Sequence, residues 1–124
     1  MDFFQRRKVL RSVSATDLIP YKLYGEEEIG NGTVSILYPR FKNIYLSRIF
    51  DPGRRKPFIP IRLDAKGSAV WNKIDGRLTS GAIIGEITTE KPELFPTPDN
   101  ATMQILKFIS LLYQQKYISF RQIG

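Results

Sequence analysis

The sequence contains no cysteine and no histidine. Without cysteine the chain has no disulfide, no thiolate metal site and no thiol nucleophile. Without histidine it lacks the commonest metal ligand and the only side chain that titrates near neutral pH with an unshifted pKa. These two absences argue against zinc chemistry and against a histidine-dependent catalytic triad.

Long apolar runs are also missing. The first residues, MDFFQRRKVLRSV, contain no apolar stretch of the length found in a signal peptide. No segment approaches the run of about 18 apolar residues that predicts a membrane-spanning helix. We therefore expect a protein that does not span a membrane and lies in the cytoplasm.

The length and composition are those of a single globular domain. The chain has 124 residues, of which 42% are hydrophobic and 25% are charged, so a hydrophobic core is expected. Residues 1–28 show weak periodicity interrupted by Pro20 and Gly25. They are predicted to be an N-terminal extension that adds an edge strand or a short helix. Residues 29–124 are predicted to form the domain itself.

The formal net charge of +7 raises the question of a partner. Positive charge attracts nucleic acid, an anionic membrane or an acidic peptide through the same long-range field. The basic residues gather in two runs, at 6–11 and 54–56, and an acidic run lies between them at 26–28. Solvated loops and binding surfaces are both compatible with such runs. The runs consist of Arg6, Arg7, Lys8 and Arg11, of Arg54, Arg55 and Lys56, and of Glu26, Glu27 and Glu28.

The stretch from residue 33 to residue 63 has the composition of β-strands. Strands are predicted over residues 33–38, 43–50 and 58–63, which are rich in β-branched and aromatic side chains. Asn31-Gly32 predicts a turn before the first of them. Pro60 has no amide hydrogen to donate to a strand ladder, so the strand over 58–63 is predicted to lie at a sheet edge.

From Asp64 onward the pattern becomes helical. Asp64 is placed to accept hydrogen bonds from the first amides of a helix over residues 65–74, and its charge suits the positive end of the helix dipole. The spacing i, i+3, i+4, i+7 predicts one buried stripe, with Trp71 as a core anchor. Asp75 and Gly76 are predicted to end this helix. The buried stripe consists of Gly67, Val70, Trp71 and Ile74.

A second and a third helix follow. Thr79 predicts the cap of a helix that reaches about residue 88, and three prolines between residues 92 and 98 predict a loop. Asp99 or Asn100 then starts a third helix to about residue 115, followed by a short strand at residues 117–120. The second helix is expected to face inward with Ile83, Ile84 and Ile87.

The third helix carries two neighbouring stripes. The first recurs at core spacing, and the second is apolar enough either to seat side chains of a peptide or to be buried in turn. Both interpretations of the second stripe remain open at this point. The first stripe is Ala101, Ile105, Phe108, Ile109 and Leu112, and the second is Met103, Leu106, Ser110 and Tyr113.

Taken together, these elements predict an α+β domain of winged-helix type, in which a three-stranded N-terminal β-sheet precedes a three-helix bundle. Its central stretch, LDAKGSAVWNKIDGRLTSGAIIGEI at residues 63–87, resembles the signature of the PqqD family. The stretch ATMQILKFISLLYQQKYISF at residues 101–120 is similar to the third helix and closing strand of that family, and ILYPRF at residues 36–41 resembles its first hairpin. The resemblance spans about residues 30–121.

The resemblance implies a non-catalytic peptide chaperone. In that family a precursor-peptide recognition element binds the leader of a ribosomally made precursor by strand addition and presents it to a modifying enzyme, often a radical SAM maturase, as in PQQ or related peptide natural product biosynthesis. It implies no enzymatic activity and no cofactor. The segment at residues 91–98 and the basic turn at 54–56 depart from the family pattern and favour a variant with a different peptide or partner.

The implied site is the groove between the strand at residues 58–63 and the third helix. Strand addition draws affinity from backbone hydrogen bonds and specificity from alternating side-chain pockets. Arg62 and Lys107 flank this groove and suit an acidic leader. The same open edge also suits a second copy of the chain, so a homodimer is an alternative. The predicted peptide-binding residues are Phe58, Ile59, Ile61, Arg62, Leu63, Met103, Leu106, Lys107, Ser110 and Tyr113.

The rival interpretation is a winged-helix DNA-binding protein. The chain is basic overall, but the third helix carries only Lys107 before Lys116, and the second helix has no basic residue. Direct readout of base edges relies on arginine, lysine and asparagine on such a helix. Nucleic acid is therefore the less favoured partner. An enzyme is disfavoured further, since the carboxylates are scattered and the serines have no histidine partner.

Overall fold

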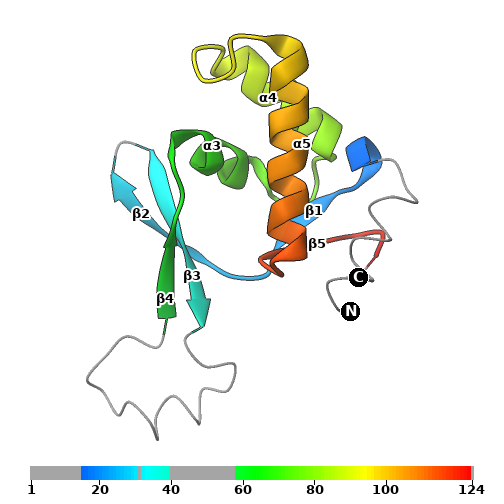
Figure 1. Ribbon diagram of the computed structural model, residues 1–124. Coiled ribbons are helices and arrows are strands. Elements are labelled where there is room, and N and C mark those ends of the chain that lie inside the picture. Colours follow the sequence, from blue (N-terminus) through cyan, green and yellow to red (C-terminus); the bar gives the residue numbers. More distant parts are fainter. Residues whose placement is uncertain (1–14, 31, 40–57, 124) are drawn as a thin grey trace, which may run out of the picture.

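The computed structural model describes residues 15–30, 32–39 and 58–123 of the chain (Figure 1). They form a mixed α+β fold with a small antiparallel sheet and three α-helices, so the predicted α+β class is confirmed. In chain order the elements are η1 (Ala15–Asp17), β1 (Pro20–Lys22), β2 (Glu26–Gly30), β3 (Thr33–Pro39), β4 (Phe58–Arg62), α3 (Ala65–Lys73), α4 (Ser80–Glu90), α5 (Pro98–Gln114) and β5 (Ile118–Phe120).

The main sheet is three-stranded and antiparallel, with the strand order β2-β3-β4. Ile36 in the central strand β3 lies opposite Ile61 of β4 on one side and opposite Glu26 of β2 on the other. The edges of this sheet are therefore β2 and β4. A separate two-stranded sheet pairs β1 with β5, with Pro20 opposite Phe120.

The strand predictions succeed at β3 and β4. The strand predicted over residues 33–38 matches β3, and the one over 58–63 matches β4, which lies at a sheet edge as Pro60 indicated. The predicted strand over 43–50, both basic runs and Asn31 lie outside the described residues. The third strand of the sheet is instead β2, which contains the acidic run at 26–28.

The sequence did not predict β2 because glutamate is depleted in strands. Its pairing comes from the β2–β3 hairpin, where Gly30 and Gly32 adopt φ of 115° and 78° and the register shifts between Glu28 and Gly30. The predicted domain boundary between residues 28 and 29 falls inside this strand.

The segment before β2 belongs to the same fold. Leu18 is buried in the core, and its carbonyl oxygen accepts hydrogen bonds from the backbone amide of Ser80 at 2.8 Å and from the Ser80 hydroxyl at 3.1 Å. β1 then pairs with β5 at the far end of the chain. The described part of the predicted extension thus contributes a short 3₁₀ helix, two strands and a core residue.

The helix boundaries follow from local capping chemistry. The Asp64 carboxylate accepts from the Gly67 amide at 2.7 Å at the start of α3, and the Thr79 hydroxyl accepts from the Ala82 amide at 3.1 Å at the start of α4. Both predicted caps are confirmed. Gly76 has φ of 78° just after α3, which confirms the predicted stop. α5 starts at Pro98 without a side-chain cap, slightly before the predicted Asp99.

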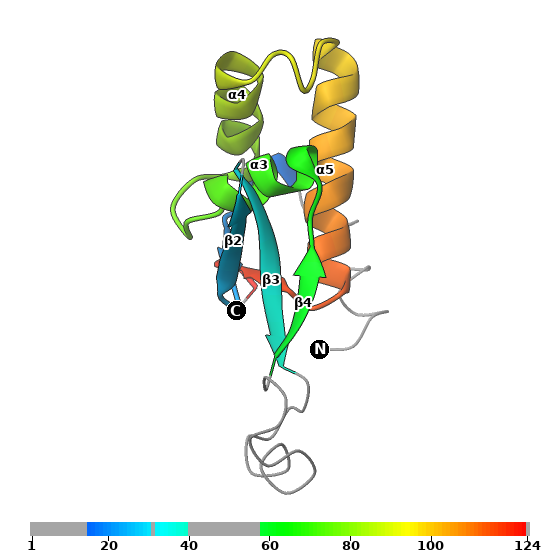
Figure 2. The same cartoon turned by 90° about the vertical axis from the view of Figure 1, so that its left-hand side faces the viewer.

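The core lies where the three helices meet the inner face of the sheet, which carries Val34 and Ile36. Trp71 is completely buried, so the predicted core anchor is confirmed, and α5 extends down the β4 side of the sheet in Figure 2. The buried stripes of α3 and α4 are as predicted. The largest fully buried side chains are Trp71, Tyr113, Phe120, Ile36, Ile74, Ile83, Ile87, Ile105 and Ile118.

Candidate functional site

Two backbone hydrogen bonds show which residues of β4 direct their backbone amide and carbonyl groups toward β3. The Leu37 amide donates to the Gly25 carbonyl at 2.9 Å, toward β2, and the Leu63 amide donates to the Val34 carbonyl at 3.0 Å, toward β3. Successive residues of a strand direct their amide and carbonyl groups to opposite sides. Ile59 and Ile61 therefore face β3 with their backbone polar groups.

The residues between them face away from the sheet with their backbone groups. Phe58, Pro60 and Arg62 present their backbone polar groups at the open edge, where no other strand of the described residues lies beside β4. Because Pro60 occupies an outward position, its missing amide hydrogen removes nothing from the β3–β4 ladder. The edge offers three carbonyl acceptors and two amide donors.

Side chains alternate between the two faces of β4. Ile59, Ile61 and Leu63 lie on the inner face, opposite Tyr38, Ile36 and Val34 of the central strand. Ile61 and Leu63 pack partly against the core, whereas Ile59 keeps 38% of its surface exposed. The inner face of the edge strand thus presents a row of three branched apolar side chains.

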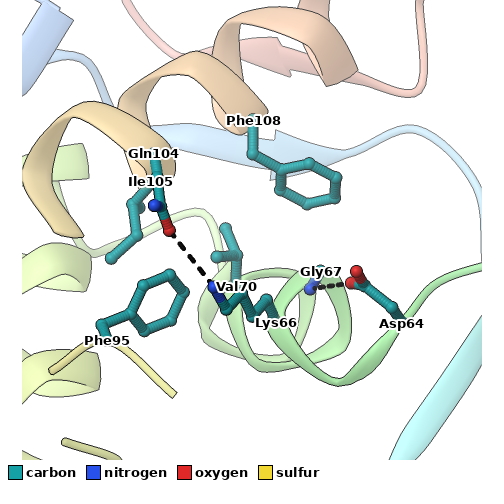
Figure 3. Close-up of a pocket in the computed structure, with 8 residues that line it drawn as sticks. All are labelled: Asp64, Lys66, Gly67, Val70, Phe95, Gln104, Ile105 and Phe108. Carbon is teal, nitrogen blue, oxygen red and sulfur yellow. Dashed lines mark hydrogen bonds between the residues drawn. The ribbon is translucent and has the colours of Figure 1, made fainter. Parts of the chain in front are cut away.

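The helix α5 supplies the facing wall through Phe108. A methyl group added at Gly67 would lie 3.1 Å from Phe108 Cζ and 3.5 Å from Leu63 Cβ, so both side chains lie close to the start of α3. Figure 3 shows Phe108 of α5 beside Gly67 of α3. Leu111, about one turn further along the same flank of α5, is 50% exposed. The flank of α5 that faces β4 is therefore the one that carries Phe108 and Leu111.

This geometry corrects the predicted second stripe of α5. At 100° per residue, Met103, Leu106 and Ser110 lie on the flank opposite Phe108, across the buried row of isoleucines. Met103 is 72% exposed, and Leu106 and Ser110 are half-buried. The spacing of apolar residues identified two stripes, but it could not indicate which one the sheet edge would face.

Tyr113 is a second correction, because it belongs to the core. Its side chain is 0% exposed, and its ring packs against Phe120 with 4.8 Å between the centroids. A residue buried in this way offers no surface to a ligand. Phe108, which the periodicity assigned to the core, is instead half-buried at the end of β4.

The predicted charged residues of the site are exposed on either side of the edge. Arg62 lies on the outer face of the sheet, opposite Ser35, and Lys107 lies on the solvent side of α5. Phe58 is also on the outer face and is 40% exposed. The predicted β4 residues therefore divide between the two faces of the sheet.

The opposite edge of the same sheet is acidic. Because the Leu37 amide donates to the Gly25 carbonyl, Gly25 and Glu27 face β3 with their backbone groups, and Glu26 and Glu28 present their backbone groups at the open edge. All three glutamates are classed as exposed, and the Glu26 carboxylate pairs with the Lys22 ammonium at 2.7 Å. Charged side chains on an edge strand oppose the addition of a further strand.

The positive charge of the chain is not carried by the described fold. Nine of the 19 lysines and arginines, but ten of the 12 aspartates and glutamates, lie within the described ranges. Within those ranges no group of three or more acidic residues is arranged to hold a metal ion. No described helix has the length and apolar character needed to cross a bilayer.

Comparison with known proteins gives no relative: no family model, no curated protein and no solved structure matches the chain. The candidate site consists of a strand edge that is unpaired among the described residues, with an apolar inner face, beside a helix flank that carries Phe108 and the exposed Leu111.

Proposed function

We propose that this chain is a non-catalytic peptide-binding module that takes up the leader of a ribosomally made precursor peptide as an additional strand on β4. The observation that carries the proposal is the outward direction of the backbone groups of Phe58, Pro60 and Arg62 beside an apolar inner face. Backbone hydrogen bonds would supply affinity, and alternating side chains would supply specificity.

The two faces of the sheet at β4 predict which kinds of side chain a bound peptide carries at alternating positions. Residues of an added strand whose side chains face inward would contact Ile59, Ile61 and Leu63 and the α5 flank with Phe108. The intervening residues would lie on the outer face beside Phe58 and Arg62. A peptide with apolar side chains at alternating positions and an acidic residue near Arg62 fits this edge.

The order of the elements supports a winged-helix-type, PqqD-like assignment within the same proposal. A three-stranded antiparallel sheet is followed by three helices, and the third helix lies on the side of the last strand (Figure 2). In this proposal the partner of the complex is a modifying enzyme of the radical SAM class. The module itself holds and presents the peptide.

DNA binding is the alternative function that an experiment must distinguish from peptide binding. Since the described residues carry slightly more acidic than basic side chains, a nucleic acid would have to bind through residues 1–14 and 40–57, which hold the other ten lysines and arginines. Such binding would be electrostatic and would weaken steeply with salt.

The test is a selection of random 15-residue peptides displayed on phage against the full chain, followed by NMR titration of the enriched peptides. We expect saturable binding with amide shifts at residues 58–63 and 108–115, and little loss of affinity between 50 and 300 mM salt. Absence of any enriched peptide, together with salt-sensitive shifts on adding a 20-base-pair duplex, would refute the peptide-binding proposal.

A further inference from the structure

A cavity of about 200 Å³ lies beyond the end of β4, between α3, α5 and the connection that precedes α5 (Figure 3). Its apolar walls are Val70 of α3, Phe95 of the connection, and Ile105 and Phe108 of α5. Pockets for drug-sized ligands measure roughly 300–1,000 Å³. The smaller volume here suits one large side chain.

The rim of the cavity carries a cation, Lys66, that pairs with no carboxylate of the described residues. Lys66 Nζ lies 3.5 Å from Gln104 Oε1 and 5.4 Å from the centroid of the Phe95 ring, and neither partner is an anion. The nearby Asp64 carboxylate accepts from the Gly67 amide at 2.7 Å and so caps α3 (Figure 3). Lys66 is therefore available to an incoming carboxylate.

The cavity adjoins the end of β4. Asp64, two residues after Arg62, is one of its lining residues, and Leu63 and the lining residue Phe108 both lie close to Gly67. A strand added to β4 would run past Leu63 and reach the mouth of the cavity. Phe95 comes from the connection between α4 and α5.

We propose that this cavity is an anchor pocket that receives one bulky apolar side chain of the peptide bound on β4, with an acidic residue of that peptide beside the anchor pairing with Lys66. This inference rests on the proposed function. It adds a fixed position to the alternating pattern, because the pocket accepts a leucine- or phenylalanine-sized side chain at one end of the bound strand only.

The experiment uses an enriched peptide and a matched pair of chain variants. Gln104→Trp places a large ring at the mouth of the pocket, and Met103→Trp places the same ring one residue away on the opposite flank of α5. Both positions are exposed, which limits the effect on folding. Cooperative thermal unfolding of each variant provides the check on folding.

We expect Gln104→Trp to lower the affinity at least tenfold and Met103→Trp to leave it within twofold. Alanine at the anchor position of the peptide should cost a similar factor with the unmodified chain and should abolish the sensitivity to Gln104→Trp. Methyl NMR signals of Val70 and Ile105 should shift on adding the anchored peptide and not on adding its alanine version.

The results distinguish failure of the anchor pocket from failure of the proposed function. If peptides bind with shifts at residues 58–63 but no anchor position emerges, or if Gln104→Trp has no effect, the anchor pocket is refuted while the proposed function stands. If no peptide binds, both fall. If Phe3→Ser and Phe4→Ser together shift the methyl signals of Val70 and Ile105 in the free chain, its own first segment is the occupant and the peptide anchor is refuted.

Discussion

The two edges of the three-stranded sheet are equally unpaired in the described fold but differ in chemistry. β4 directs Ile59, Ile61 and Leu63 toward the helical side, whereas β2 directs Glu26 and Glu28 toward it. An unpaired edge is a template for any extended chain, and charge on the strand is one way in which proteins block it. Under the proposed function, the apolar inner face of β4 makes it the binding edge, whereas the charge on β2 keeps the opposite edge unoccupied.

Pro60 adds a further difference between the β4 and β2 edges. The apolar edge retains its acceptors but lacks one donor, which lowers the tendency of two copies to pair through β4. A peptide that also contacts the α5 flank gains side-chain contacts that a second β4 edge would not provide. Under the proposed function, Pro60 thus favours a peptide over self-association.

The largest expected effect is the difference in peptide affinity between two matched isoleucine variants, one on each edge strand. Ile59→Asp on β4 should weaken binding of an enriched peptide by about thirtyfold or more, because a charge would be buried beneath the peptide. Ile29→Asp on β2 should change it less than twofold. The two side chains are 38% and 42% exposed, so both variants should fold cooperatively. Calorimetric titration measures the difference, and equal losses would contradict the assignment of the site to β4.

A smaller effect of opposite sign is expected at Pro60. Pro60→Ala restores an outward amide donor and should tighten peptide binding about three- to tenfold, in line with a net contribution of roughly 0.5–1.5 kcal/mol for one hydrogen bond. Pro92→Ala, in the exposed connection before α5, is the control and should have no effect on affinity. Unchanged affinity of Pro60→Ala would rule out antiparallel or parallel pairing along this part of β4.

The acidic edge can be tested by removing its charge. Glu27→Thr combined with Glu28→Thr replaces poor strand formers with a good one and should raise the stability of the fold by up to about 1 kcal/mol. It should also introduce weak self-association that increases with concentration in sedimentation experiments. Asp17→Thr with Glu93→Thr removes the same charge away from both edges. Self-association of the control to the same extent would mean that net charge, rather than the edge, keeps copies apart.

The smallest effect is expected away from both edges, at Asp75. Hydrogen bonds from the Leu78 and Arg77 amides hold the pKa of this exposed carboxyl below its ordinary value of 3.8. A lowered pKa stabilises the fold above that value, and this contribution is lost as the pH falls through the folded pKa. Asp75→Ala should therefore cost about 0.5–1 kcal/mol at pH 7 and less at pH 2, with peptide affinity unchanged.

Chemical denaturation at several pH values measures this contribution. A stability difference between Asp75→Ala and the unmodified chain that persists undiminished at pH 2 would show that the aspartate acts through something other than its charge. A change in peptide affinity would show that the loop after α3 is energetically coupled to the β4 edge.

Local chemistry made much of the fold predictable. Asp64 and Thr79 cap their helices through their own side chains, Gly76 supplies the left-handed residue after α3, and the spacing around Trp71 identifies the buried stripe. Pro60 marked its strand as an edge. Each of these features depends on residues within a few positions of one another, which is why the sequence reveals them.

The candidate site was only half predictable, because it depends on long-range placement. The β4 residues follow from the strand pattern, but the α5 flank does not. Phe108 and Leu111 have the same periodic spacing as core residues, while Tyr113 looks as suitable for a surface as Met103. Only the packing of α5 against α3 and β5 decides which side chains are buried and which one lies near Gly67 and Leu63.

By itself, the sequence determined the class of fold, the helix caps, the core anchor and one edge of the sheet, since these follow from short-range backbone and side-chain preferences. The tertiary structure alone decided that the acidic run at residues 26–28 forms the other edge. It also decided that Phe108 faces that first edge and that Phe95 closes a cavity beyond it. Those outcomes join residues between six and forty-five positions apart, and no local preference specifies which of them will lie side by side.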